Sequence, residues 1–250
     1  MTRAPDRPSR KPPAWQDAEV VGVLEEAPDA VTLRLRLDEG EPFLPGQYYN
    51  VRLPVPGRER PVQRAYSIGS SPLPDPALID IGVRELPGGL ISPRLVKDLP
   101  VGSHLAMRGP AGRFTWTGSP DPVLLVGAGS GLVPLMSMVR FAVFTARKSP
   151  MWLVCSAITY DHAFYRGELD RLASEQPWLR VIHCVTRDAD EHRASYRRRI
   201  DASILAEVLD GERPASAYLC GPPAMVEQVA ADLSATLRMS PEVIHTEKYD

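Results

Sequence analysis

The sequence predicts two domains, an antiparallel β-barrel followed by an α/β domain built on a parallel, Rossmann-like sheet. Residues 19–112 form short runs of β-favouring residues separated by proline and glycine, a pattern typical of a closed barrel or a sandwich. After Pro120, apolar runs alternate with segments of helical periodicity, which indicates βαβ units and a parallel sheet covered on both faces. Glycine, serine and two prolines gather at 117–122. We therefore expect a barrel domain over 15–117 and an α/β domain over 118–250.

The expected strands of the first domain follow one another at short spacing. Residues 31–37 alternate apolar and polar side chains, as a strand with one buried face does. The other candidate strands are residues 48–53, 65–69, 78–83 and 104–108. One interruption, residues 89–96, has its apolar side chains at helical spacing, which predicts a short helix.

The second domain begins with a continuous apolar run at 123–126. That run leads into a glycine-rich turn and then into an amphipathic helical segment that extends through Arg147. The later candidate strands are residues 152–155, 181–185 and 217–220. The candidate helices between and after them are residues 165–174, 203–209 and 225–237.

The composition is that of a globular protein. Of the 250 residues, 44% are apolar and 24% are charged, and the formal net charge of −2 argues against general binding to nucleic acids. No apolar run reaches the roughly 18 residues that cross a bilayer. Residues 1–14 are rich in proline and arginine and lack an apolar signal core, so we expect a disordered leader and a cytoplasmic protein.

The cysteines and histidines show no metal-binding spacing. Cys155, Cys184 and Cys220 form neither the CxxC pattern of zinc sites nor the C-x4-C-x2-C run of a plant-type iron–sulfur cluster. The five histidines likewise lack ligand spacing. We therefore expect no metal site and no cluster of that kind in this chain.

Two segments of the first domain suit a flat, phosphorylated ligand. Arg64-Ala65-Tyr66-Ser67 supplies a cation, an aromatic face and a hydroxyl, although such a string also fits a half-buried barrel tyrosine beside a solvated charge. Gly88-Gly89-Leu90-Ile91-Ser92 opens a helix, where backbone N–H groups and the serine hydroxyl can bind a pyrophosphate. Arg64 would supply the counter-charge.

Two segments of the second domain suit another phosphorylated ligand. Gly127-Ala128-Gly129-Ser130-Gly131-Leu132-Val133-Pro134 follows a strand and precedes a helix, which is the context of a phosphate-binding loop. It departs from the GxGxxG fingerprint because Leu132 stands at the third glycine position, and Pro134 fits the first helical turn. Cys220-Gly221-Pro222-Pro223-Ala224-Met225 places a thiol and a tight turn at the carboxyl end of a strand, where α/β sheets bind ligands.

Taken in this order, the motifs resemble those of the ferredoxin–NADP reductase superfamily, in particular its stand-alone flavoprotein reductases without an iron–sulfur domain. The resemblance covers residues 17–249. It implies a flavin on the barrel, and FAD rather than FMN because residues 88–92 leave an opening for a pyrophosphate. In such a protein Tyr66 lies against the isoalloxazine and Ser67 hydrogen-bonds near its reactive nitrogen. The other implied flavin contacts are Arg64, Ala65, Val83, Arg84, Gly89, Leu90, Ile91 and Ser92, with Arg64 and Ser92 holding phosphate.

The resemblance also implies a nicotinamide coenzyme on the second domain. Cys220 would lie beside the nicotinamide ring and Glu247 near both rings, so the expected catalytic residues are Ser67, Cys220 and Glu247. Tyr249 would shield the flavin until the nicotinamide displaces it, although Asp250 follows where some relatives end on the aromatic residue. The expected coenzyme contacts are Gly127, Gly129, Ser130, Gly131, Pro134, Ser156, Arg187, Arg199, Cys220, Gly221, Pro222, Met225 and Tyr249.

NADP is the favoured coenzyme, with NAD as the alternative. Arg187 and the run Arg197-Arg198-Arg199 lie beyond the third strand, where arginines can clamp an adenosine 2′-phosphate. Such a run also fits a solvated surface, and Ile158 stands where many NADP-using relatives carry arginine.

These features imply a reductase that passes electrons from NAD(P)H through FAD to a separate acceptor such as a ferredoxin, because the chain shows no cluster of its own. Two alternatives stay open. One is a reductase of free flavin, quinone or ferric chelates, and the other is a non-autonomous electron-transfer subunit of a larger complex. We expect no nucleic-acid partner and no membrane span.

Overall fold

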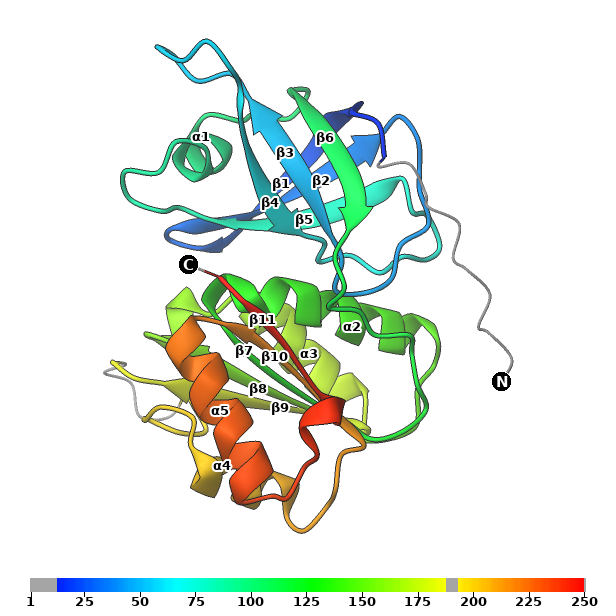
Figure 1. The fold of residues 1–250 in the computed structure, drawn as a ribbon, viewed down its shortest axis with the longest axis vertical. Helices are drawn as coiled ribbons and strands as arrows, with labels where there is room; N and C mark the ends of the chain where they lie inside the picture. Colours follow the sequence, from blue (N-terminus) through cyan, green and yellow to red (C-terminus); the bar gives the residue numbers. More distant parts are fainter. Residues whose placement is uncertain (1–12, 188–192, 250) are drawn as a thin grey trace, which may run out of the picture.

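The computed structural model describes residues 13–187 and 193–249, and it places the two domains one above the other (Figure 1). The predicted leader lies, up to residue 12, outside the described residues. The first domain contains β1 (Gln16–Ala27), β2 (Ala30–Leu37), β3 (Tyr48–Leu53), β4 (Val62–Ser67), β5 (Leu78–Arg84), α1 (Ser92–Lys97) and β6 (His104–Ala111). Its strands form one antiparallel sheet in the order β4-β3-β6-β1-β2-β5, and a bridge between Ile68 and Ile81 joins the two ends. The predicted barrel is therefore confirmed over the sandwich.

Strand β1 is the barrel element that the sequence analysis did not single out. Its register with β2 shifts between Val20 and Gly22, and the side chains of Val21 and Val23 are 38% and 40% exposed. A bulge changes which side chains face inward, so the simple alternation that identifies a strand is lost.

The inward side chains of the other strands fill the barrel. Leu33 and Leu35 of β2, Tyr49 and Val51 of β3 and Met107 of β6 have no exposed surface. They follow the two-residue period of a strand with one buried face. This core supports β4, whose last residue is Ser67.

The second domain contains the parallel sheet. Its elements are β7 (Val123–Ala128), α2 (Leu132–Phe144), β8 (Met151–Ala157), α3 (Arg166–Glu175), β9 (Leu179–Val185), α4 (Ala202–Leu209), β10 (Ser216–Gly221), α5 (Pro223–Ala235) and β11 (Ile244–Lys248). The strands are all parallel, in the order β11-β10-β7-β8-β9. Helices α2 and α3 share one core with the sheet, and α4 and α5 share another, so both faces are covered as predicted.

Strand β11 was not anticipated as a strand. Its sequence, Ile-His-Thr-Glu-Lys, has no apolar run, because β11 is an edge strand held to β10 by backbone pairing. A strand of this kind needs few apolar side chains, so periodicity does not reveal it.

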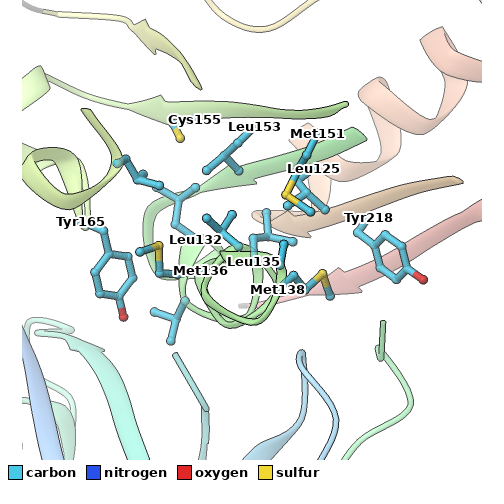
Figure 2. Packing of buried hydrophobic residues seen from close by; sticks show 14 of the residues in the cluster. Leu125, Leu132, Leu135, Met136, Met138, Met151, Leu153, Cys155, Tyr165 and Tyr218 are labelled. Carbon is cyan, nitrogen blue, oxygen red and sulfur yellow. The ribbon is translucent and has the colours of Figure 1, made fainter. Parts of the chain in front are cut away.

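Helix α2 differs from the expected amphipathic helix because both of its sides are covered. Every residue from Leu132 to Val139 is buried. Figure 2 shows why: Leu125 and Leu153 of the sheet lie on one side of the helix, and segments of the barrel lie on the other. Helix α2 is therefore the layer that joins the two domains.

No helix within the described part of the chain is long and apolar enough to cross a membrane.

Candidate functional site

A cleft of about 430 Å³ lies where the two domains meet, and residues far apart in the sequence line it. The barrel supplies Arg64, Ala65, Tyr66, Ser67, Gly82, Arg84, Leu86, Gly89, Leu90, Ile91 and Ser92, and the second domain supplies Ser130, Val133, Lys248 and Tyr249. Both barrel motifs, the glycine-rich loop and the C-terminal segment therefore meet at one place.

Strand β4 presents the first motif to the cleft. Ser67 is buried, Tyr66 is half-buried against the barrel core, and Arg64 is exposed. Burial raises the pKa of Tyr66 to about 12, against the opposing effect of the Arg64 charge, so the phenol stays protonated. Among the described residues no carboxylate pairs with Arg64, whose guanidinium donates to the Gln63 carbonyl at 2.8 Å. Its charge is available to a phosphate.

The turn before α1 completes the barrel side of the cleft. Gly88 has a φ of +75°, and the hydroxyl of Ser92 accepts a hydrogen bond from the backbone N–H of Leu86 at 3.0 Å. That hydroxyl keeps its own proton to donate to a phosphate oxygen. The side chains of Leu86 and Leu90 are 62% and 37% exposed, which leaves apolar surface for a flat ring. Cation, hydroxyl, aromatic face and uncovered apolar surface together fit FAD.

Val83 and Arg84 are placed differently from each other. The side chain of Val83 is fully buried in the barrel core, so any ligand contact would come from its backbone. Arg84 lines the cleft and also reaches the second domain, donating to the His162 carbonyl at 2.6 Å. Its guanidinium carbon lies 5.0 Å from the centre of the Phe164 ring. Arg84 therefore joins the domains at the edge of the cleft.

The glycine-rich loop packs directly against the Cys220–Gly221 turn. Gly129 has a φ of +57°, and Gly127 ends the buried part of β7. A Cβ atom at Gly131 would lie 2.2 Å from the Cys220 carbonyl oxygen, so only glycine fits there. Pro134 is the third residue of α2, where the backbone N–H has no intrahelical partner to lose. The two motifs thus form a single wall at the carboxyl ends of β7 and β10.

Tyr249 connects this wall to the barrel. Its hydroxyl lies 2.5 Å from the hydroxyl oxygen of Ser67 and donates to Glu247 at 3.1 Å. The β10–β11 register pairs Cys220 with Glu247. The structure therefore brings together the three expected catalytic residues and Tyr249.

The protonation of this group follows from its burial. Burial raises the pKa of the Cys220 thiol to about 12, so the sulfur is a neutral, polarizable group rather than a thiolate. Burial also raises the pKa of Glu247, while the hydrogen bond from Tyr249 acts in the opposite direction. Both groups hold their protons more strongly than they would in water.

The expected contacts for the rest of the coenzyme lie outside the cleft, along the same edge of the sheet. Ser156 is near the end of β8, and the N–H of the exposed Arg187, just after β9, donates to Ile158 at 2.8 Å. Arg199 is exposed ahead of α4, and residues 188–192 lie outside the described ranges. Pro222 caps α5, and the Met225 methyl group would lie 3.0 Å from a Cβ at Gly221.

Sequence reasoning did not single out four lining residues: Gly82, Leu86, Val133 and Lys248. Leu86 directly precedes the Pro-Gly-Gly turn, so its position was a signal that could have been used. Gly82 is required by contact between domains, because a Cβ there would lie 2.3 Å from a methyl group of Val133. That requirement is visible only in three dimensions. Within residues 13–187 and 193–249, no group of three His, Cys, Asp or Glu side chains is placed to hold a metal ion.

Comparisons with known proteins match both halves of this arrangement. Family models of an oxidoreductase FAD-binding domain and an oxidoreductase NAD-binding domain match residues 17–116 and 125–231. The chain is 32% identical over 241 residues to ferredoxin–NADP reductase B of Sorangium cellulosum, covering 94% of this chain and 97% of that protein. It is 32% identical over 238 residues to the reductase subunit of an aromatic O-demethylase of Amycolatopsis, covering 93% and 68%.

A solved structure shows the same fold. The FAD- and NAD-binding domain of a nitric oxide dioxygenase from Vibrio cholerae superposes with a TM-score of 0.83 at 23% identity, covering 94% of this chain and 98% of that one. The two family models together cover most of the chain. The chain is therefore an FAD-dependent NAD(P)H oxidoreductase and belongs to the ferredoxin–NADP reductase superfamily.

Proposed function

We propose that this protein takes electrons from NADPH and delivers them through FAD to a separate redox protein. The observation that carries the proposal is the shared cleft, in which β4 of the barrel meets Tyr249 of the second domain. Tyr249 bonds both Ser67 and Glu247, and Glu247 is paired in the sheet with Cys220. A flavin held in the cleft would supply the chemistry that converts a two-electron hydride donor into single-electron transfer. The residues on either side of the cleft would hold the two rings against each other, which makes hydride transfer effectively unimolecular.

Each residue has a distinct role in this proposal. Arg64 and Ser92 hold the pyrophosphate, and Tyr66 covers one side of the flavin ring. Ser67 hydrogen-bonds at the reacting edge. Cys220, as a neutral thiol, packs against the nicotinamide ring, and Glu247 accepts hydrogen bonds beside it. Tyr249 occupies the cleft until the nicotinamide displaces it.

The preference for NADPH rests on arginines at the far end of the coenzyme. Arg187 and Arg199 are exposed near the carboxyl end of β9, where a 2′-phosphate would find positive charge. Ile158, which is 50% exposed at the end of β8, supplies no charge there. Anaerobic titration of the flavin absorbance with NADPH and with NADH decides the preference, and equal reduction by the two coenzymes would overturn it.

The identity of the acceptor is proposed from the relatives. The relative from Sorangium, which this chain matches over almost its whole length, is a ferredoxin–NADP reductase by name, and the Amycolatopsis relative is the reductase subunit of an aromatic O-demethylase. We further propose that the protein works in the cytoplasm, where pyridine coenzymes are held.

Stopped-flow reoxidation of the reduced protein tests the acceptor. We expect a [2Fe–2S] ferredoxin to reoxidise the flavin faster than free FMN, a quinone or a ferric chelate does. The reverse order would favour a reductase of small molecules. If the isolated chain does not reduce even an artificial electron acceptor such as ferricyanide, the result would instead favour a subunit that works only inside a complex.

A further inference from the structure

Helix α2 contacts the barrel through a single row of residues. The helix begins at the glycine-rich loop, and Ser130 of that loop lines the cleft. Val133, Ser137 and Arg140, spaced by four and three residues, lie on one face of the helix. Val133 abuts Gly82 of β5, and the hydroxyl of Ser137 donates to the carbonyl of Ser70 at 2.6 Å. This face of α2 therefore points at the barrel.

Arg140 is bonded to both domains at once. Its guanidinium makes two hydrogen bonds with Glu168 of α3, at 3.0 and 2.6 Å. The same guanidinium donates to the Gly69 carbonyl at 2.9 Å and lies 3.3 Å from the carboxylate of Asp80 in β5. Neighbouring carboxylates raise the pKa of Arg140 despite its burial, so the charge is permanent. One side chain thus pairs with an acid from each domain.

The barrel side of this contact is itself held rigidly. The side chain of Asp80 is only 5% exposed, and Arg34 binds both of its carboxylate oxygens, at 2.8 and 3.0 Å. The backbone N–H of Asp80 donates to the Ser70 hydroxyl at 3.0 Å, and the N–H of Gly69 donates to the backbone carbonyl of Asp80 at 2.7 Å. The segment 69–70 is therefore fixed to β5 by bonds that do not involve α2.

The segment 69–70, to which α2 is hydrogen-bonded, lies just after a cleft residue in the chain. Gly69 and Ser70 lie two and three positions after Ser67, which hydrogen-bonds Tyr249 in the cleft. The amino end of α2 is formed by the loop expected to bind the coenzyme phosphates. One helix, buried from Leu132 to Val139, consequently connects the coenzyme loop with the segment that follows β4.

We propose that Arg140 and Ser137 are positioning residues, which set the distance and angle between the coenzyme loop and the Ser67 end of β4. The inference rests on the proposed hydride transfer across the cleft. Neither residue lines the cleft. Ser137 bonds the carbonyl of Ser70, and Arg140 bonds the carbonyl of Gly69 and Asp80, so each holds the barrel against α2. Misplacement of about 1 Å between reacting groups can lower a rate by about 100-fold, so a clamp here has kinetic consequences.

The test compares Arg140→Met and Arg140→Lys with the control Arg36→Met. Arg36 forms an exposed ion pair with Asp75 within the barrel and, among residues 13–187 and 193–249, bonds nothing across the domain boundary. We expect Arg140→Met to keep its FAD and to bind NADP⁺ within a few-fold of wild type. Its flavin should be reduced by NADPH about 10- to 100-fold more slowly. Arg140→Lys should recover part of the rate because it keeps the charge without the planar fork, and Arg36→Met should match wild type.

Hydrogen exchange gives a second readout that needs no turnover. The backbone amides of residues 69–70 and of the middle of α2 should exchange faster in Arg140→Met than in wild type. In Arg36→Met their exchange rates should equal those of wild type. Wild-type rates of reduction in Arg140→Met, or unchanged exchange at 69–70, would overturn the proposal. If Arg140→Met does not fold, Ser137→Ala tests the proposal by the same two measurements, the rate of flavin reduction and the hydrogen exchange at 69–70. A wild-type protein that NADPH does not reduce would defeat the proposed function instead, while hydrogen exchange would still report on the clamp.

Discussion

Arg64 shows how a single side chain prepares a site for a ligand. It is exposed, it has no carboxylate partner among the described residues, and it stands at the edge of the cleft on β4. Replacing Arg64 with alanine should weaken FAD binding by about 10- to 100-fold, since a charged hydrogen bond contributes about 1.5–3 kcal/mol. The ratio of flavin to protein absorbance after purification measures the loss. Arg58→Ala, an exposed arginine outside the cleft, should keep its full flavin content, and equal retention by both variants would remove Arg64 from the phosphate site.

Glu247 gives a pH-dependent prediction at the same scale. Its pKa is raised by burial, so the folded state disfavours the ionised carboxylate, and stability falls as pH rises through the folded pKa. Glu247→Gln keeps an acceptor for Tyr249 without the charge. We therefore expect the melting temperature of the variant to exceed that of wild type increasingly from pH 4 to pH 8. A constant or shrinking difference would mean that the carboxylate is not penalised by its surroundings.

At the scale of the element, the glycine loop depends on close backbone contact. A Cβ at Gly131 would meet the Cys220 carbonyl at 2.2 Å, so Gly131→Ala should push the loop away from the Cys220–Gly221 turn. We expect the affinity for NADP⁺ to fall by about tenfold or more, a loss of at least about 1.4 kcal/mol, with FAD retained on the barrel. Difference spectroscopy measures this affinity.

The matched control for the loop is Gly167→Ala in α3. Nothing lies within 4 Å of a Cβ at Gly167, and alanine favours a helix by up to about 1 kcal/mol. This variant should bind both ligands normally and be no less stable than wild type. Normal NADP⁺ binding by Gly131→Ala would show that the loop adapts to the added methyl group.

At the scale of the whole molecule, the C-terminus and the barrel meet across 182 positions of sequence through Tyr249 and Ser67. Tyr249 lines the cleft, and in the proposed function the nicotinamide displaces it. Tyr249→Ser should therefore bind NADP⁺ more tightly, by about tenfold or more, while keeping FAD. Equilibrium titration of the oxidised protein with NADP⁺ tests this. Weaker binding in the variant would show that Tyr249 supports the coenzyme rather than competing with it.

Much of this protein can be read from local sequence. The repeated β segments, the change of rhythm after Pro120 and the four ligand-binding segments depend on residues adjacent in the chain. The structure contains the barrel and the parallel sheet that they predict. Residues of both barrel segments and Ser130 of the glycine-rich loop line the cleft. Strands β1 and β11 were not predicted, because prediction from sequence depends on apolar periodicity. A bulge disrupts that periodicity in β1, and an edge position removes the need for it in β11.

The sequence by itself determined which chemical groups this protein carries and which short loops present them. Only the tertiary structure decided how they meet: the Tyr249–Ser67 contact, the burial of α2 on both sides and the pairing of Arg140 with acids of both domains. The physical reason is that local conformation follows from neighbouring residues. Contacts between domains instead join side chains that are distant in the chain, and no periodicity records which ones will face each other.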